Sequence, residues 1–296
     1  MKRIKWILIV AVFIFLISSL FSGCVHNGQF FSDSIIHDGL NRTFTVYIPP
    51  SLDSNSQTYP LVIALHGAGS NGTVMIGTAL LVTKAIREKF IVVAPDALPH
   101  PYVTYFNAGE YYENLTDHTD DVGFISKLID EMIANYPVDL TRVYVMGHSN
   151  GGIMAYRIAA QIPDKIAAIA SNSGPMVYEY PPIAPVPIIH MHGLEDNLID
   201  YNGTVLNGVI VPPVDEVMET WRLVNGCGEN PVQIYYDNDP GSYGEIIGKK
   251  WVSADGKHDI VLYTFEKGGH GWRYKEDGLS ATDYFWDFLK LHTLTT

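Results

Sequence analysis

The chain has 296 residues, of which 47% are hydrophobic, and it carries a formal net charge of −13 at pH 7. So acidic a chain argues against nucleic acid as a partner, because phosphate binding requires a surplus of lysine and arginine. The length is enough for one large α/β core, and no internal repeat or low-complexity linker divides it, so we expect a single folded domain over residues 35–296.

The first 23 residues have the pattern of an export signal. Three of the first five residues are basic, residues 6–20 are an almost unbroken apolar run, and small residues precede Cys24. We expect cleavage before Cys24, which would be lipidated as in bacterial and archaeal lipoproteins. The alternative is a retained anchor helix, which Phe21 favours because lipoboxes usually carry Leu there. Either way the folded part is predicted to be extracellular, secreted or held at the cell surface, with residues 24–34 as a tether.

Beyond this tether, segments of strand and helix character alternate along the chain. Apolar or alternating runs predict strands, and apolar residues spaced three and four apart predict helices. Strands are expected at 42–48, 60–67, 90–96, 142–146, 165–171, 186–192, 232–236, 250–253 and 259–265, and helices at 75–89, 121–136, 153–160, 214–224 and 280–292. Residues 97–119 lack periodicity and are interpreted as a long surface loop. This alternation is typical of a mostly parallel central sheet flanked by helices.

The segment 147–151 reads Gly-His-Ser-Asn-Gly, the motif G-x-S-x-G, between a predicted strand and a predicted helix. In a nucleophile elbow the serine occupies so tight a turn that side chains two residues away on either side would collide, which explains the two glycines. The backbone N–H of Asn150, at the start of the helix, is placed to hold an oxyanion. We therefore interpret Ser149 as a nucleophile.

A serine hydroxyl becomes nucleophilic when a base takes its proton and a carboxylate orients that base. Among eleven histidines, His270 has the best context, because it lies in a glycine-rich loop just after the last predicted strand. Asp196 follows the strand at 186–192 and is preferred as the carboxylate, with Glu195 as the alternative. The chain order Ser149, Asp196, His270 is that of α/β-hydrolases.

Four other histidines lie near predicted strand ends or in the elbow. We expect structural roles near the site for His66, His148 and His192. His190 and His192 are two residues apart and could share a metal ion on one face of a strand, but no third ligand offers itself, so no metal is predicted.

The turn after the strand at 60–67 is rich in glycine, which would let a second backbone N–H approach a substrate. We expect Ala68 to be this donor; the alternative is that the glycines only make a tight turn. Asp120 and Asp121 are expected to cap the next helix rather than to form a paired acid site. Several aromatic residues could line a substrate groove, or be ordinary loop packing: Tyr102, Tyr105, Phe106, Tyr111, Tyr112 and Trp272.

With these motifs the sequence resembles secreted α/β-hydrolase esterases of the polyhydroxybutyrate depolymerase, LpqC-like and feruloyl or acetylxylan esterase type, carbohydrate esterase family 1. The resemblance covers about residues 40–291. It is carried by Tyr47-Ile48-Pro49, Leu65-His66-Gly67, Phe106-Asn107-Ala108-Gly109, residues 120–124 and 138–157, His192-Gly193 with Asp196, Trp221 with Asn225-Gly226-Cys227, and Gly268-Gly269-His270. The family often has cysteines shortly after the position of Gly109, one of which can pair with the cysteine of Asn-Gly-Cys. None follows here, so Cys227 is expected to be unpaired.

The resemblance and the motifs together predict an α/β-hydrolase fold and hydrolysis of carboxylic esters through an acyl-enzyme on Ser149. His270 would be base and then acid, Asp196 would orient it, and Ala68 and Asn150 would hold the oxyanion. No cofactor is expected. The substrate would be a feruloyl or acetyl ester of plant polysaccharide, or a hydroxyalkanoate polyester. Two alternatives remain: a serine peptidase or other acyl hydrolase on this fold, and a surface lipoprotein that binds polysaccharide without turnover.

Overall fold

The computed structural model describes residues 28–50, 52, 57–100, 103–109, 118–206, 209–237, 243–272 and 280–294. The predicted export signal at 1–23, Cys24, and the aromatic residues Tyr102, Tyr111 and Tyr112 lie outside these ranges. Every helix within them is too short or too polar to span a lipid bilayer.

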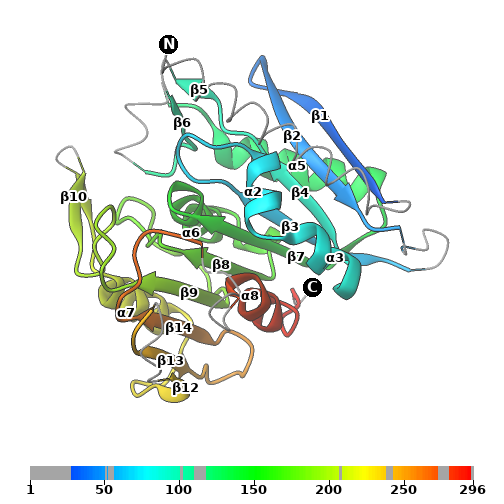
Figure 1. The fold of residues 1–296 in the computed structure, drawn as a ribbon. Helices are drawn as coiled ribbons and strands as arrows, with labels where there is room; N and C mark the ends of the chain where they lie inside the picture. The colour runs from blue at the N-terminus through cyan, green and yellow to red at the C-terminus, as the bar shows by residue number, and fades with distance from the viewer. Residues whose placement is uncertain are drawn as a thin grey trace, which may run out of the picture.

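Ten of the described strands form one continuous sheet through the middle of the molecule (Figure 1). Their spatial order is β1 (Gln29–His37), β2 (Leu40–Ile48), β4 (Ile91–Pro95), β3 (Tyr59–Leu65), β7 (Val138–His148), β8 (Ala168–Asn172), β9 (Ile188–Gly193), β14 (Ile260–Phe265), β13 (Ile246–Trp251) and β12 (Val232–Asp237). The six strands from β4 to β14 run parallel, and antiparallel strands complete both edges. The predicted mostly parallel sheet is confirmed.

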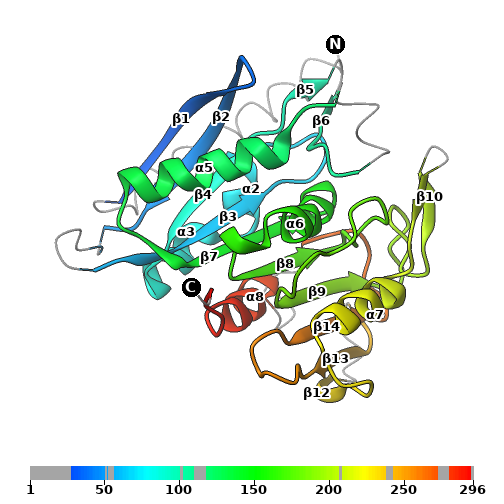
Figure 2. The same cartoon turned by 180° about the vertical axis from the view of Figure 1, so that it is seen from behind.

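Helices cover both faces of this sheet (Figures 1 and 2). One face carries α2 (Gly72–Thr78), α3 (Leu81–Glu88) and α8 (Ala281–Leu289), and the other carries α5 (Asp121–Asn135), α6 (Asn150–Gln161) and α7 (Val214–Val224). The parallel strands are apolar on both sides and would lose that burial if either helix layer were absent. Two separate apolar cores result, one on each side of the sheet.

The connections between the main strands and helices contain a 3₁₀ turn and two small hairpins. A short 3₁₀ turn, η1 (Pro163–Lys165), links α6 to β8. Two small hairpins pair β5 (Pro99–His100) with β6 (Val103–Thr104) and β10 (Thr204–Leu206) with β11 (Val209–Val211). The first hairpin lies in the stretch expected to be an irregular loop, and the second projects from the body of the molecule in both views (Figures 1 and 2).

Two segments differ from the expectation. Residues 29–34, predicted as part of the tether at 24–34, belong to β1, which pairs with β2 along its whole length. Phe31 and Ile35 are the apolar side chains of this edge strand that are half-buried against the core, so its apolar signal is weak. The helix predicted at 75–89 is divided into α2 and α3, because Leu80 adopts a left-handed conformation with φ of 51°, which an α-helix cannot contain.

A buried ion pair joins β2 to α5. The Arg42 guanidinium donates from Nη2 to Asp121 Oδ1 and lies 4.0 Å above the centre of the Phe124 ring. Asp121 also accepts the backbone N–H of Asn107 through its other oxygen, at 2.6 Å. The predicted helix-capping role therefore holds for Asp120, which caps the first turn of α5, but is wrong for Asp121.

His292, just beyond α8, is expected to make the fold sensitive to acid. Its Nδ1 donates to the carbonyl of Lys257, and burial lowers its pKa from 6.5 to about 4. The folded state thus binds this proton less readily than the unfolded chain, so its contribution to stability is complete above pH 6.5 and lost as the pH falls towards 4. Between pH 7 and pH 5 the expected loss is about 2 kcal/mol. Urea unfolding should show that loss, and His292→Gln, which cannot be protonated, should reduce it; an unchanged pH dependence would contradict the assignment.

Cys227, three residues after the end of α7, is a free thiol, as predicted. Its Sγ lies 3.5 Å from the carbonyl oxygen of His258, and the side chain is buried. Burial raises the pKa of this thiol to about 11.

Candidate active site

Ser149 stands between β7 and α6 in a backbone conformation that few side chains adopt, with φ of 54° and ψ of −121°. Its two flanking glycines have no room for a side chain. A Cβ on Gly147 would lie 2.1 Å from the carbonyl oxygen of Gly151, and a Cβ on Gly151 would lie 2.3 Å from that of Leu65. Backbone atoms cannot move aside, so the glycines of the G-x-S-x-G motif are required by the turn itself.

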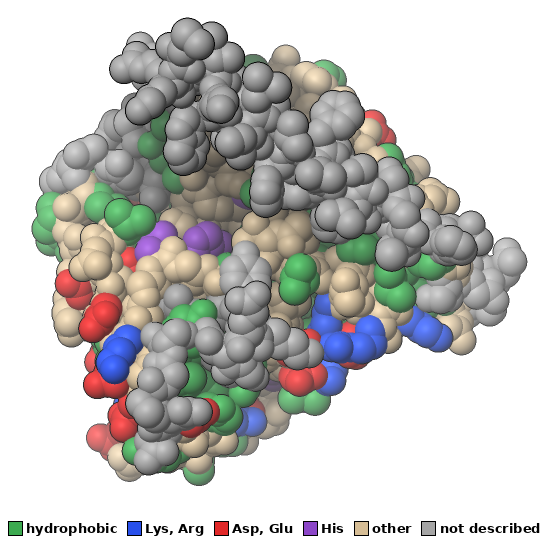
Figure 3. All heavy atoms as spheres, viewed as in Figure 1, with side chains coloured by type: hydrophobic (Ala, Val, Ile, Leu, Met, Phe, Trp, Pro, Cys, Tyr) green, Lys and Arg blue, Asp and Glu red, His purple; other side chains and the backbone are tan. Residues whose placement is uncertain are grey.

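The structure brings the three predicted catalytic side chains together from three strand ends. Ser149 follows β7, Asp196 follows β9, and His270 follows β14. His270 Nε2 lies 2.8 Å from Ser149 Oγ, and its Nδ1 lies 2.7 Å from Asp196 Oδ2. Glu195, the alternative carboxylate, is exposed to solvent. Histidine side chains reach the surface beside a hollow on the face seen in Figure 3.

Asp196 is held as a carboxylate although its side chain is fully buried. Burial alone would raise the pKa of Asp196. The hydrogen bond from His270, together with the backbone N–H groups of Ile199 and Leu198 at 3.0 and 2.9 Å, outweighs this and lowers the pKa. Since this carboxylate accepts from Nδ1 of the imidazole, Nε2 is left to accept a proton from the serine hydroxyl.

One predicted oxyanion donor, Asn150, lies within the elbow, and the other, Ala68, lies in the turn after β3. Asn150 is the first residue of α6, so its N–H is among those that a helix leaves without an intrahelical acceptor. Ala68 is exposed in the turn after β3 and follows Gly67, where an added Cβ would lie 3.4 Å from the Ser149 Cβ, so the turn runs close beside the nucleophile. His66 fixes this turn: its Nε2 accepts the N–H of Ala97 and its Nδ1 donates to the carbonyl of Gly67.

The side chain of Asn150 has a second role that the sequence did not indicate. It bonds the backbone of Phe106 twice, accepting its N–H at 2.8 Å and donating to its carbonyl at 3.0 Å. At the next residue, Asn107, the carbonyl accepts from Arg157 of α6 at 2.6 Å and the backbone N–H donates to Asp121. The segment 106–109 is thereby fixed against the helix that carries the nucleophile.

Asn172, at the end of β8, is another contact that the sequence did not indicate. Its Nδ2 donates to His148 Nδ1 at 2.9 Å and to the carbonyl of Gly271 at 3.0 Å. It therefore joins the elbow to the loop that carries His270. Asn172 reaches His148 because the ends of β7 and β8 are adjacent. A single asparagine in the sequence does not indicate such contacts.

The predicted aromatic groove is only partly compatible with the structure. Phe106 is fully buried, with its ring 4.7 Å from that of His66. Trp272 is 5% exposed, packs edge-on against Phe285, and donates its indole N–H to Thr282. Both side chains are part of the apolar cores in this conformation, and their predicted contact with substrate stays a prediction. Tyr105 is half-buried, and its predicted contact with substrate stays a prediction.

Two groups of side chains have the composition of a metal site. His190 and His192 bond to each other, with Nε2 and Nδ1 3.1 Å apart, rather than facing a shared ion. Among the described residues, His37, Asp38 and Asp120 have possible ligand atoms within 4.8 Å of one another. Asp120 already caps α5 and lies 3.1 Å from His37, and we assign no metal to the group.

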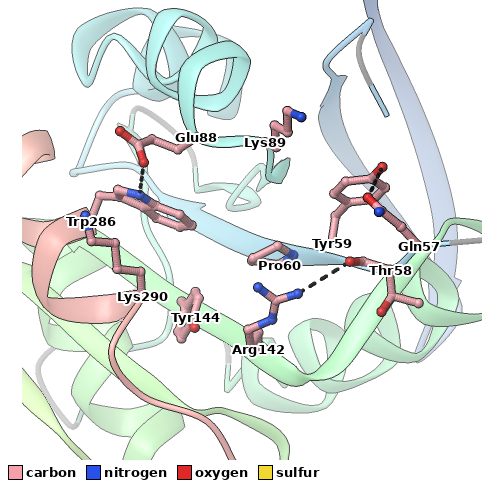
Figure 4. A pocket seen from close by; sticks show the side chains of 10 residues that line it. All are labelled: Gln57, Thr58, Tyr59, Pro60, Glu88, Lys89, Arg142, Tyr144, Trp286 and Lys290. Carbon is pink, nitrogen blue, oxygen red and sulfur yellow. Dashed lines mark hydrogen bonds between the residues drawn. The ribbon is translucent and has the colours of Figure 1, made fainter. Parts of the chain in front are cut away.

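A pocket of about 250 Å³ lies at the opposite end of the strands (Figure 4). Tyr59 and Pro60 in its lining are the first residues of β3, whereas Ser149 follows the last residue of the parallel neighbour β7. Two of its cations are matched by acids, since Arg142 pairs with Asp139 and Lys290 with Asp287. The pocket is therefore remote from Ser149 and takes no part in its chemistry.

The sheet order, the helices on both faces and the strand–elbow–helix at Ser149 are those of the α/β-hydrolase fold. Residues 52–207 match the family described as Phospholipase/Carboxylesterase, and the chain belongs to that family. The solved acetyl xylan esterase from Aspergillus awamori has the same fold, with a TM-score of 0.61 at 17% identity over 88% of this chain and 99% of that one.

Two curated relatives carry names of esterases. The chain is 35% identical over 164 residues to the bifunctional acetylxylan esterase/xylanase XynS20E of Neocallimastix patriciarum, covering 55% of this chain and 22% of that protein. It is 28% identical over 256 residues to feruloyl esterase B of Piromyces equi, covering 83% of this chain and 44% of that protein. This chain thus spans less than half the length of either relative. The predicted resemblance to α/β-hydrolase esterases of the feruloyl esterase type is confirmed.

Proposed function

We propose that this protein is a serine esterase that hydrolyses carboxylic esters through an acyl-enzyme on Ser149. The observation that carries the proposal is the continuous line of contacts from Ser149 Oγ to His270 Nε2, at 2.8 Å, and from His270 Nδ1 to Asp196, at 2.7 Å. Such a line lets the imidazole take the hydroxyl proton while the carboxylate stabilises the imidazolium that forms.

The reaction then has two halves. Ser149 Oγ attacks the ester carbonyl carbon as His270 takes its proton, and the oxyanion is held by the N–H groups of Asn150 and Ala68. The imidazolium gives the proton to the departing alcohol as the C–O bond breaks, which leaves the acyl-enzyme. Water then attacks the acyl carbon as His270 takes one of its protons. The bond between Ser149 Oγ and the acyl carbon breaks, the acid is released, and His270 returns the proton to Ser149 Oγ.

The names of the relatives support feruloyl or acetyl esters of plant polysaccharide as the substrate class, and a hydroxyalkanoate polyester is kept as the second candidate. From the export pattern of residues 1–23 we propose that the protein is secreted or attached to the membrane through Cys24. Either location would give it access to a polymer outside the cell.

The test is a substrate panel with the purified protein: methyl ferulate, acetylated xylan, a 3-hydroxybutyrate oligomer and a p-nitroanilide amide. We expect release of ferulate or acetate at least about 10-fold faster than amide cleavage, and a single covalent fluorophosphonate adduct on the peptide that contains Ser149. Preferred cleavage of the amide would replace the proposal with a peptidase. Failure to hydrolyse any ester, with no adduct formed, would refute catalysis and favour a binding protein.

A further inference from the structure

Behind Asp196 lies a row of buried polar side chains that the proposed reaction does not use. Tyr156 of α6 places its hydroxyl 3.0 Å from His190 Nδ1, and His190 Nε2 lies 3.1 Å from His192 Nδ1. The planes of the two imidazoles are 10° from parallel and their ring centres are 5.3 Å apart, which suits a hydrogen bond from one ring edge to the other. His192 Nε2 lies 2.8 Å from the carbonyl oxygen of Ile199. All three side chains are fully buried.

The last contact of this row fixes its own direction, and a neutral His192 fixes the direction of the other two hydrogen bonds. A carbonyl oxygen only accepts, so His192 Nε2 must carry a proton and donate to Ile199. If the ring is neutral, its Nδ1 is then an acceptor, which requires His190 Nε2 to donate. His190 Nδ1 is in turn left to accept the hydroxyl proton of Tyr156.

Burial supports this neutral arrangement. It lowers the pKa of His190 well below its ordinary value and raises that of Tyr156 well above its own. Any charge in the row would lie close to the catalytic carboxylate, because His192 Nε2 is 3.6 Å from Asp196 Oδ2. When His192 is neutral, His270 is the residue whose positive charge the Asp196 carboxylate stabilises during the reaction.

The row ends on the turn that shapes the carboxylate. Ile199 donates its N–H to Asp196 Oδ1, and its carbonyl accepts from His192. Both polar backbone groups of Ile199 are therefore bonded, which fixes the turn 196–199. At its other end the row is anchored in α6, the helix that begins directly after Ser149. One line of side chains thus connects the nucleophile helix to the acid turn through the interior.

We propose that Tyr156, His190 and His192 are positioning residues that hold the Asp196 turn against the nucleophile helix and so keep the carboxylate aligned with His270. The inference rests on the proposed function and deepens it. None of the three would touch substrate; they act through Asp196.

The test compares two substitutions at one position. His192→Leu removes both hydrogen bonds, whereas His192→Gln can still donate to Ile199 and accept from His190. We expect His192→Leu to lower kcat by about 10–100-fold with little change in KM, the range found when a supporting hydrogen-bond partner is lost, and His192→Gln to recover at least half of that loss on a logarithmic scale. The low-field proton resonance of the His270–Asp196 bond, assigned by its absence in Asp196→Asn, should disappear in the leucine variant and return in the glutamine variant.

Should His192→Leu fail to fold, Tyr156→Phe tests the far end of the row by removing one hydroxyl, with an expected fall in kcat of about 2–5-fold. Tyr144→Phe is its matched control, since that buried hydroxyl bonds the carbonyl of His292 instead. A leucine variant with kcat within about twofold of the parent and an unchanged resonance would overturn the inference, as would equal effects of the two tyrosine changes. The resonance is independent of turnover, so an inactive parent protein would refute the proposed function while the resonance in the His192 variants would still decide this inference.

Discussion

Replacing Ser149 with alanine is expected to lower kcat on any ester that the protein cleaves by about 10⁴–10⁶-fold, because no other group can form the acyl-enzyme. The unfolding midpoint should stay within about 2 °C of the parent. Alanine also has a Cβ, so the strain of a positive φ at this position is the same in both proteins, and only the hydroxyl bond to His270 is lost.

The measurement is steady-state hydrolysis of a p-nitrophenyl ester beside thermal unfolding of the same samples. Ser32→Ala, at an exposed position on the edge strand β1, is the matched control and should change neither quantity. Residual activity of Ser149→Ala above about 1% of the parent would mean that the reaction takes place elsewhere, and the proposed mechanism would be abandoned.

Breaking the buried ion pair is expected to have the largest effect on stability. Asp121→Asn leaves the Arg42 charge uncompensated at a position with 0% exposure, which costs about 3–5 kcal/mol. For a domain of this size the unfolding midpoint should fall by about 6–20 °C. Nε and Nη1 of Arg42 have no hydrogen-bond partner among the described residues, so Asp121 is its main compensation.

Lys290→Met provides the comparison, because its pair with Asp287 is exposed and should be worth less than about 1 kcal/mol. Urea unfolding of the two variants would measure both values. If Asp121→Asn cost no more than Lys290→Met, the buried pair would not be a stabilising tie between β2 and α5. Asp121 also holds the backbone of Asn107, so activity should fall together with stability.

The parts of the site that local sequence could predict are those in which one short segment sets the geometry. The elbow is such a segment, since Gly147 and Gly151 are required by contacts within the turn and the strand beside it. Asp196 and His270 were predictable because parallel strands bring their carboxyl ends to one edge, so position relative to a strand was enough. The fold followed from the same alternation of strands and helices.

Contacts between distant segments were not predictable in this way. Arg42 and Asp121 are 79 positions apart, and the pairing that makes Asp121 an ion-pair partner depends on how α5 crosses β2. Phe106 and Trp272 were assigned to a groove because they lie in aromatic-rich loops and Trp272 is two residues from His270, but sequence position does not say which side of a loop faces the core. The edge strand β1 was missed because most of its side chains are exposed, which leaves little apolar pattern in the sequence.

The buried thiol of Cys227 is expected to react slowly with disulfides and oxidants. Disulfide exchange proceeds through the thiolate, and a pKa of about 11 in place of 9 leaves about 100-fold less of that form at neutral pH. Cys227 should therefore be slow to cross-link two copies of the protein through a disulfide.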